Sequence, residues 1–423
     1  MNNKKSQLEI VLIDKNKRGK IIDWRGKKFS SLSLARIYKR IGEKLKDEYK
    51  KRGVAPRYKY VTRKVIDGSG IKVSEIRTQS KGLYDSNGKR VVNYEGRAES
   101  IKYCGSYLSF AYYNDTSMKL INANFCRVPL CPMCQWRKSL RIFFDVSRIM
   151  EMVEERHSDY KALFLTLTVR NCGVDDLKNT LDSIFKGWVR FMNSRTLRPE
   201  KNGEQKHTII KGWFRALEVT YDSDEIITPQ RYKKAKNYYD ERGLSPGDMN
   251  FNYNTFHPHF HAIMLVDKKY FTGADYMKTT EWVQLWRQAA KLDYDPSCYI
   301  SKTKNKKGMR KEVAEVAKYT YKDAEILNKK LSDLTKDNVI KNLSTAFHGR
   351  RLYAYGGIMK DIADELNIKD VDKSDLIKVD GNNINSGVAE MILTYGWHVG
   401  LSNYTLLKTE KNNMSDKRET NSQ

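Results

Sequence analysis

Apolar and polar residues alternate in three segments in the middle of the chain. In ALFLTLTVRN (162–171) the leucines fall on one side of an extended chain, while Phe164, Thr166 and Thr168 fall on the other. Strand side chains point alternately to opposite faces, so this pattern predicts a strand with one apolar face and one largely hydroxyl face. WFRALEVTY (213–221) and HFHAIMLV (259–266) predict two further strands.

Other segments repeat their apolar residues at helical spacing. Such spacing lets one stripe of a helix pack against a neighbouring element. The segments that show it are 31–49, 135–156, 173–194, 279–290 and 311–327. We therefore predict an α+β fold, with a central antiparallel sheet of about four or five strands, flanking helices on its apolar face and the functional site on the opposite face.

Shifts in composition divide the chain into five regions. We expect a basic N-terminal region over 1–95, whose helix packs on the body of the protein or lies along a phosphate backbone. A cysteine cluster follows over 96–135, a domain with the predicted strands over 136–330, and an accessory region over 331–410. The tail 411–423 has no apolar periodicity, so we predict that it is disordered.

Positive charge is in excess and is concentrated near the start of the chain. The 423 residues include 78 Lys and Arg against 51 Asp and Glu, a net charge of +27. Residues 1–64 hold 21 Lys and Arg against 6 Asp and Glu, a net charge of +15. This excess favours a polyanion as partner, because each Lys or Arg placed on a phosphate releases counterions. The alternative is a solvated basic face that serves only solubility.

Composition also excludes several classes of protein. With 40% hydrophobic and 11% aromatic residues, the chain is too apolar for general disorder. No apolar run reaches the roughly 18 residues of a membrane span, and the first residues lack the apolar region of a signal peptide. We therefore expect a cytoplasmic protein with no membrane partner.

Four cysteines lie close together in the sequence and predict a structural zinc site. Cys131 and Cys134 are two residues apart, a spacing that lets both thiolates bind one tetrahedral ion. Cys126 and the more remote Cys104 would complete a four-cysteine site. Disulfides are disfavoured in the cytosol, which leaves a redox dithiol or unrelated core cysteines as the alternatives.

Histidines cluster on the third predicted strand. His259 and His261 project from the same face, and two imidazoles at this spacing can chelate a divalent ion. On the second strand Glu218 lies opposite the apolar face, where burial without a partner would be costly. A metal would supply that partner, and a salt bridge to a basic neighbour is the alternative. His257 is two residues before His259, so it falls on the same face of the predicted strand and is an alternate ligand, although Pro258 could end the strand.

The predicted helix 311–327 places three polar side chains on one face. Glu315, Tyr319 and Lys322 recur at helical spacing. A phenol is a poor nucleophile near neutral pH, since its pKa is about 10, but a metal and a nearby lysine would offset this weakness. The alternative is a surface helix with simple side-chain pairs. The preceding stretch SKTKNKKGMRK offers a DNA path through its cations Lys302, Lys304, Lys306, Lys307 and Arg310.

Three segments together resemble a known enzyme family. FLTLTVRN, HPHFHAIM and EVAKYTYK resemble, in order and spacing, the three motifs of the HUH endonucleases that initiate rolling-circle replication of Gram-positive plasmids. The chain is similar to the single-tyrosine branch of these Rep proteins. That branch also carries a cysteine cluster like FCRVPLCPMCQWRKSL and a later segment like GRRLYAYGG. The resemblance covers roughly 103–360 and makes 136–330 the expected catalytic domain.

The resemblance implies a metal-dependent nickase and strand transferase. His259 and His261 would bind Mg2+ or Mn2+ with Glu218 as third ligand, and Tyr319 would attack one strand at the double-strand origin. This leaves a 5′-phosphotyrosine and a free 3′ hydroxyl that primes a polymerase. Glu315 would activate water for the terminating cleavage and rejoining, and Lys322 would hold the phosphate.

The implied partners are single- and double-stranded plasmid origin DNA, together with a host polymerase and helicase. No GxxxxGK[ST] phosphate-binding loop is present in the sequence, so helicase activity would come from the host. Two alternatives stay open. One is another HUH enzyme, a mobilisation relaxase or a single-strand transposase. The other is a non-catalytic zinc-containing protein that binds nucleic acid.

Overall fold

A computed structural model describes most of the chain. The described residues are 13–15, 21–66, 72–113, 118–201, 204–205, 208–303, 306–318, 320–368, 375–377, 379, 389 and 391–411. Of the predicted disordered tail, only Lys411 is included, as the last residue of a strand; the rest lies outside the described residues. Within the described part, none of the helices combines the length and the apolar character that a membrane crossing needs.

A central antiparallel sheet confirms the predicted α+β architecture. Its strands run in the order β14 (Cys298–Lys302), β8 (Tyr160–Thr168), β13 (Thr255–Asp267), β12 (Ile210–Tyr221) and β15 (Tyr353–Gly357), and the short β9 (Cys172–Gly173) pairs with the start of β13. The three predicted strands thus form the centre of the sheet. β15 comes from the GRRLYAYGG segment, where glycine is required: a Cβ at Gly356 would lie 2.3 Å from the Trp213 side chain.

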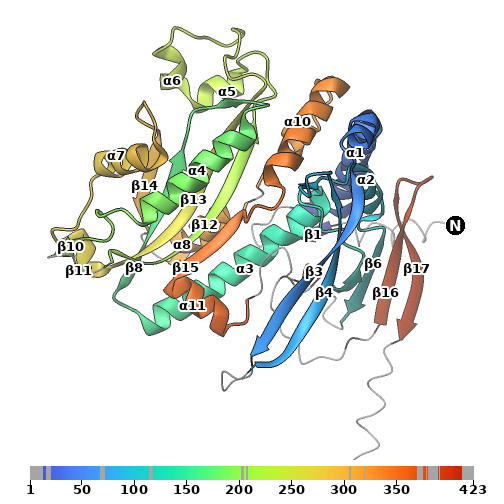
Figure 1. The fold of residues 1–423 in the computed structure, drawn as a ribbon, viewed down its shortest axis with the longest axis horizontal. Helices are drawn as coiled ribbons and strands as arrows, with labels where there is room; N and C mark the ends of the chain where they lie inside the picture. Colours follow the sequence, from blue (N-terminus) through green and yellow to red (C-terminus); the bar gives the residue numbers. More distant parts are fainter. Residues whose placement is uncertain are drawn as a thin grey trace, which may run out of the picture.

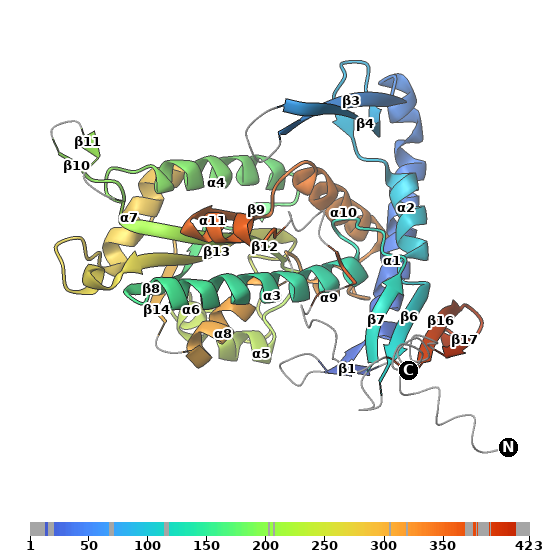
Figure 2. The same cartoon turned by 90° about the horizontal axis from the view of Figure 1, so that it is seen from below.

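Helices cover both faces of this sheet, which Figure 2 shows edge-on. One face packs on α4 (Leu177–Met192), α7 (Thr279–Ala290) and α10 (Asp333–Phe347) through the predicted leucines of β8. The other face packs on α3 (Pro132–Arg156), α8 (Lys306–Val316) and α11 (Ile358–Glu365) through Phe164, Ile263 and Leu265. The prediction of helices on one face only is therefore wrong, because this second face is polar only toward one end of the strands.

The predicted helix over 311–327 is also wrong in its length. α8 ends at Val316, and a separate short helix, α9, covers Asp323–Ile326. Between them the carbonyl of Thr320 accepts a hydrogen bond from the Val219 N–H at 2.7 Å. The backbone at Thr320 therefore pairs with the edge of β12 and does not continue the helix.

The N-terminal helix packs on the body of the protein (Figure 1). α1 (Trp24–Lys51) lies against α2 (Tyr94–Tyr103), α3 and α10 and buries Leu34, Ile41 and Leu45. A hairpin follows it, formed by β3 (Ala55–Ile66) and β4 (Lys72–Tyr84), to which β5 (Arg90–Val91) adds. Of the two alternatives for this helix, docking on the protein is confirmed.

A second sheet joins two strands from the cysteine-cluster region to two strands near the C-terminus. Its strands run β17 (Asn403–Lys411), β16 (Met391–His398), β6 (Tyr107–Tyr112) and β7 (Met118–Ala123). The remaining short elements are β1 (Ile13–Lys15), β2 (Ile21–Asp23), β10 (Glu200–Lys201), β11 (Glu204–Gln205), α5 (Pro229–Lys234), α6 (Lys236–Asp240) and a 3-10 turn (Lys268–Phe271). α5 and α6 lie in the polar excursion 222–254 between β12 and β13, beyond the end of the sheet (Figure 1).

Candidate metal centre and nucleic-acid site

Two neighbouring strands bring a carboxylate and two imidazoles together. Glu218 of β12 is the register partner of His259 on β13, and His261 lies two residues further along the same face. The Glu218 Oε2 atom is 3.1 Å from Nε2 of His261 and 3.5 Å from Nε2 of His259. The three side chains therefore lie together on one face, as the alternation in the sequence predicted.

Hydrogen bonds on the far side of each ring fix the orientation of the histidines. Nδ1 of His259 lies 3.2 Å from the carbonyl of His257, and Nδ1 of His261 lies 3.1 Å from Oγ1 of Thr166. These contacts leave both Nε2 atoms directed at the same carboxylate. Metal-binding histidines are oriented in the same way, through a hydrogen bond from the ring nitrogen that does not bind the ion.

The trio suits a divalent cation. Its three ligand atoms lie within 4.8 Å of one another, and all three residues are buried. Burial opposes the ionisation of Glu218, but the hydrogen bonds and charges of His259 and His261 outweigh it and hold the pKa of Glu218 well below its usual range. A histidine binds a metal through a neutral ring nitrogen, so the two Nε2 atoms and the carboxylate are three donors of lone pairs that one cation could accept together.

His257 lies beside the trio but outside it. Its ring centroid is 5.2 Å from that of His259, and β13 continues through Pro258, so the proline does not end the strand. Burial and the neighbouring His259 lower the pKa of His257 to about 4, so its imidazole is neutral near neutral pH. Its role as an alternate ligand stays a prediction.

The residues that follow position 319 lie against the trio. Tyr319 itself lies outside the described residues. On its C-terminal side, the Lys322 Nζ atom is 3.9 Å from Oε1 of Glu218, and Thr320 is held against Val219. The helical face predicted for Glu315, Tyr319 and Lys322 is wrong because α8 ends at Val316. Lys322 reaches the trio from a loop instead.

The other predicted DNA-site residues lie along α8 and the strand before it. Glu315, near the end of α8, forms an ion pair with Lys318. Lys307 and Arg310 are exposed on α8, and exposed Lys302 ends β14 with its Nζ 4.0 Å from the centre of the Phe271 ring. Lys304 and the side chain of Lys306 lie outside the described residues.

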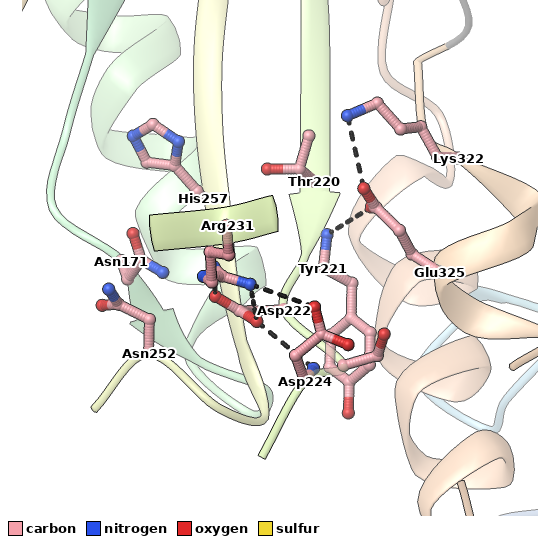
Figure 3. A pocket seen from close by; sticks show the side chains of 11 residues that line it. Asn171, Thr220, Tyr221, Asp222, Asp224, Arg231, Asn252, His257, Lys322 and Glu325 are labelled. Carbon is pink, nitrogen blue, oxygen red and sulfur yellow. Dashed lines mark hydrogen bonds and ion pairs between the residues drawn. The ribbon is translucent and has the colours of Figure 1, made fainter. Parts of the chain in front are cut away.

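Glu325 is a site residue that the sequence pattern did not reveal. Its Oε2 accepts a hydrogen bond from the Tyr221 N–H at 3.1 Å, and its Oε1 lies 3.3 Å from Nζ of Lys322 (Figure 3). Burial, as the largest effect, raises the pKa of this carboxyl group. The sequence did not single out Glu325, because it fell on the polar side of the helix predicted over 311–327.

A polar cavity of about 370 Å³ opens beside the trio. Lys322, Glu325 and His257 form part of its wall, and the excursion after β12 forms much of the rest (Figure 3). The trio is not among the lining residues, so the cavity is a neighbouring space and not the metal position itself.

The four predicted cysteines meet in one cluster. All four sulfurs lie within 4.8 Å of one another, with Cys134 Sγ 3.5 Å from that of Cys104 and 3.7 Å from that of Cys126. Zinc–sulfur bonds of about 2.3 Å place the sulfurs of a tetrahedral site about 3.8 Å apart. None of the four forms a disulfide. The chemistry and spacing of this donor set therefore fit a metal ion, and Cys104 belongs to it despite its remote position in the sequence.

A buried lysine of α1 supports this cluster. Lys28 Nζ donates to the carbonyls of Lys102 and Cys104, both at 2.8 Å, and to Oγ of Ser106 at 2.7 Å. Burial lowers the pKa of Lys28 to about 8, against the opposing effect of the Cys104, Cys131 and Cys126 thiolates. Ser31, one turn further along α1, lies with its Oγ 3.6 Å from Sγ of Cys131.

Comparison with known proteins agrees with the motif resemblance. A Protein rep of Bacillus amyloliquefaciens is 31% identical over 418 residues, covering 94% of this chain and 97% of the relative. A Protein rep of a Bacillus species is 34% identical over 68% of this chain and 86% of its own length. A Protein rep of Streptococcus pneumoniae serotype 2 is 27% identical over 93% and 95%.

No solved structure matches the chain significantly. The family described as Replication protein, in contrast, matches residues 117–405, a span that contains three of the four cysteines, the histidine strand and the segment around position 319. Together with the full-length relatives, this match shows that the chain belongs to the Rep replication-protein family.

Proposed function

We propose that this protein initiates plasmid rolling-circle replication by nicking one strand of origin DNA, with Tyr319 as the nucleophile and Mg2+ or Mn2+ held by Glu218, His259 and His261. The observation that carries the proposal is the meeting of a buried carboxylate and two imidazoles next to the segment that contains position 319. Membership of the Rep family supports it.

The bound cation would polarise the scissile phosphate and stabilise the charge that develops on it. Tyr319 would form a bond from its hydroxyl oxygen to phosphorus while the bond to the 3′ oxygen breaks. The phenol proton is released as this bond forms, the 3′ oxygen takes up a proton to leave as a free hydroxyl, and the phosphate stays on the tyrosine. Because the phosphodiester energy is kept in this ester, rejoining needs no nucleotide. Lys322, whose Nζ lies 3.9 Å from Oε1 of Glu218, would contact the same phosphate.

Glu315 would activate the water for the terminating cleavage. A general base must reach the reacting atoms directly or through one water. Glu315 is the last residue but one of α8 and is partly exposed, and it forms an ion pair with Lys318, the residue before position 319. Lys302, Lys304, Lys306, Lys307 and Arg310 would guide the single strand toward this segment.

We also propose that Cys104, Cys126, Cys131 and Cys134 hold a structural Zn2+, since four buried or half-buried thiolates at tetrahedral spacing are typical of zinc. The protein would act in the cytoplasm on single- and double-stranded origin DNA. A host helicase would unwind the duplex from the nick, and a host polymerase would extend the 3′ hydroxyl.

The metal dependence can be tested with supercoiled plasmid that carries the cognate origin. Purified protein should convert it to the nicked form with Mn2+ and not with EDTA. His261→Ala should slow nicking by at least about 100-fold, because phosphoryl transfer depends on positioning and charge neutralisation. His157→Ala is the matched control, since His157 lies at the far end of α3. Equal nicking by the His261 and His157 variants would contradict the metal assignment.

A further inference from the structure

The cavity beside the trio has two chemically different walls. Ion-paired side chains form one wall, where Arg231 bonds Asp222, with one contact at 2.9 Å, and lies 3.4 Å from Asp224. Lys322 lies 3.3 Å from Glu325 in the same cavity. Both cations of the lining are therefore already engaged by carboxylates, and carboxylates outnumber cations. This wall disfavours a phosphate group inside the cavity.

Amide, hydroxyl and imidazole side chains form the other wall. Asn171 and Asn252 lie on the side away from Lys322 and Glu325, with His257 near them, and Thr220 lies on β12 between the two sides (Figure 3). Amide and hydroxyl side chains offer donors and acceptors together, as the edge of a nucleobase requires. Among the described residues, the Asn171 amide donates one hydrogen bond to a side chain, to Oγ1 of Thr255 at 2.8 Å. The chemistry of this wall suits an uncharged, flat, polar group.

The cavity also lies at the correct place for a part of the DNA. His257, on its wall, has its ring 5.2 Å from that of His259, and Lys322, on the other side, lies 3.9 Å from Glu218. A group in the cavity is therefore a direct neighbour of whatever phosphate lies at the trio. The volume of about 370 Å³ is large enough for one base.

We propose that this cavity binds the base of one nucleotide next to the scissile phosphate, turned out of the single-strand stack and read through its hydrogen-bonding edge by Asn171 and Asn252. The proposal rests on the proposed nicking function and adds a position of base recognition to it. The excursion 222–254, which contributes Asp222, Asp224, Arg231 and Asn252 to the lining, then serves as a specificity element.

The test is a scan of origin oligonucleotides in which one nucleotide at a time around the nick is made abasic. Binding is measured by fluorescence anisotropy in EDTA, so that the result does not depend on metal or cleavage. For the wild-type protein, removal of the base at one position should weaken binding by about tenfold. This is the size of effect expected when one base loses its hydrogen bonds to the protein. Asn252→Ala should bind the intact oligonucleotide about tenfold more weakly and lose this dependence on the base at that position.

Two further variants keep the test decisive. Asn252→Asp retains the size of the side chain but removes the amide donor, so it should change which base is preferred at the sensitive position. Asn237→Ala removes an exposed amide from α6 in the same excursion and should behave as wild type.

A scan with no sensitive position, or one whose sensitive position is unchanged in Asn252→Ala, would overturn the proposal. If the protein nevertheless nicks DNA with Mn2+, only the cavity assignment fails. If a base position is found but no nicking occurs, the proposed function fails instead.

Discussion

Glu325 connects the loop after position 319 to the end of β12. It accepts the Tyr221 N–H and holds Lys322, which in turn lies against Glu218. We expect Glu325→Ala to slow nicking by about 10- to 100-fold, because small displacements of reacting groups have effects of this size. Glu325→Gln should be intermediate, since its amide oxygen can still accept the Tyr221 N–H.

Single-turnover nicking rates at saturating DNA measure this effect. Glu225→Ala is the matched control, because Glu225 is an exposed carboxylate of the excursion. If the loss acts through Lys322, then Lys322→Ala and the double variant should have similar rates. Additive losses, or a Glu325→Ala variant as fast as wild type, would contradict the positioning role.

For helices and strands, the hydrophobic periodicity of the sequence predicted an element correctly where the local pattern and the tertiary packing agreed. The three central strands were predictable because each is a short run rich in apolar and β-branched residues, although both of its faces are buried. The face shared by Glu218, His259 and His261 was predictable because strand side chains alternate. Helix 311–327 was not, because Thr320 pairs with the edge of β12. Its Tyr-Thr-Tyr run has only moderate helix propensity, so one strand contact suffices to end the helix.

The cavity and the position of Glu325 could not be predicted from the sequence, for a related reason. They depend on how the excursion 222–254 and α9 fold back against the end of β12, and neither segment has a strong apolar period. The cysteine cluster was easier, because the close spacing of Cys131 and Cys134 is itself a metal-binding signal. What the sequence did not show is that Lys28 and Ser31 join α1 to it.

The cysteine cluster should hold about one metal ion that stabilises this whole end of the protein. We expect Cys131→Ser to lose the zinc and to lower the melting temperature by more than about 5 °C, since the binding energy of a structural zinc is folding energy. Metal analysis and thermal unfolding measure both effects. Cys298→Ser, at an isolated cysteine of β14, should retain the metal. Zinc-free wild-type protein that melts at the same temperature would contradict this role.

Lys28 gives a second test at the same element. Lys28→Met should leave the Lys102 and Cys104 carbonyls without their buried donor and cost about 2–4 kcal/mol of unfolding free energy. Denaturant unfolding measures the loss. An exposed lysine of the same helix, Lys46→Met, is the control. A loss no larger than the control's would show that α1 is not anchored through Lys28.

At the scale of the whole molecule, the basic N-terminal region has both a structural face and an exposed face. α1 buries one side against the body, so removing it would damage the fold. Its exposed side carries Arg36, Lys39, Lys46 and Lys50. We expect replacement of these four by Gln to weaken duplex origin binding by about tenfold and reduce its salt dependence, while cleavage of a short single-stranded oligonucleotide survives.

Binding titrations at several salt concentrations measure this effect. The control replaces four exposed lysines elsewhere, Lys268, Lys269, Lys329 and Lys330, so that the net charge changes equally. An equal loss of duplex binding in the two variants would show that the charge of α1 acts only through the net charge of the protein, as expected for a solvated basic face.

The central claim is that Tyr319 becomes covalently joined to the 5′ phosphate of cut origin DNA. The most direct measurement is peptide mass analysis of the adduct formed with Mn2+ and a single-stranded origin oligonucleotide. We expect one modified peptide, with a 5′-phosphonucleotide on Tyr319, and none from Tyr319→Phe. A modified residue other than Tyr319, or cleavage that leaves no covalent adduct, would contradict it.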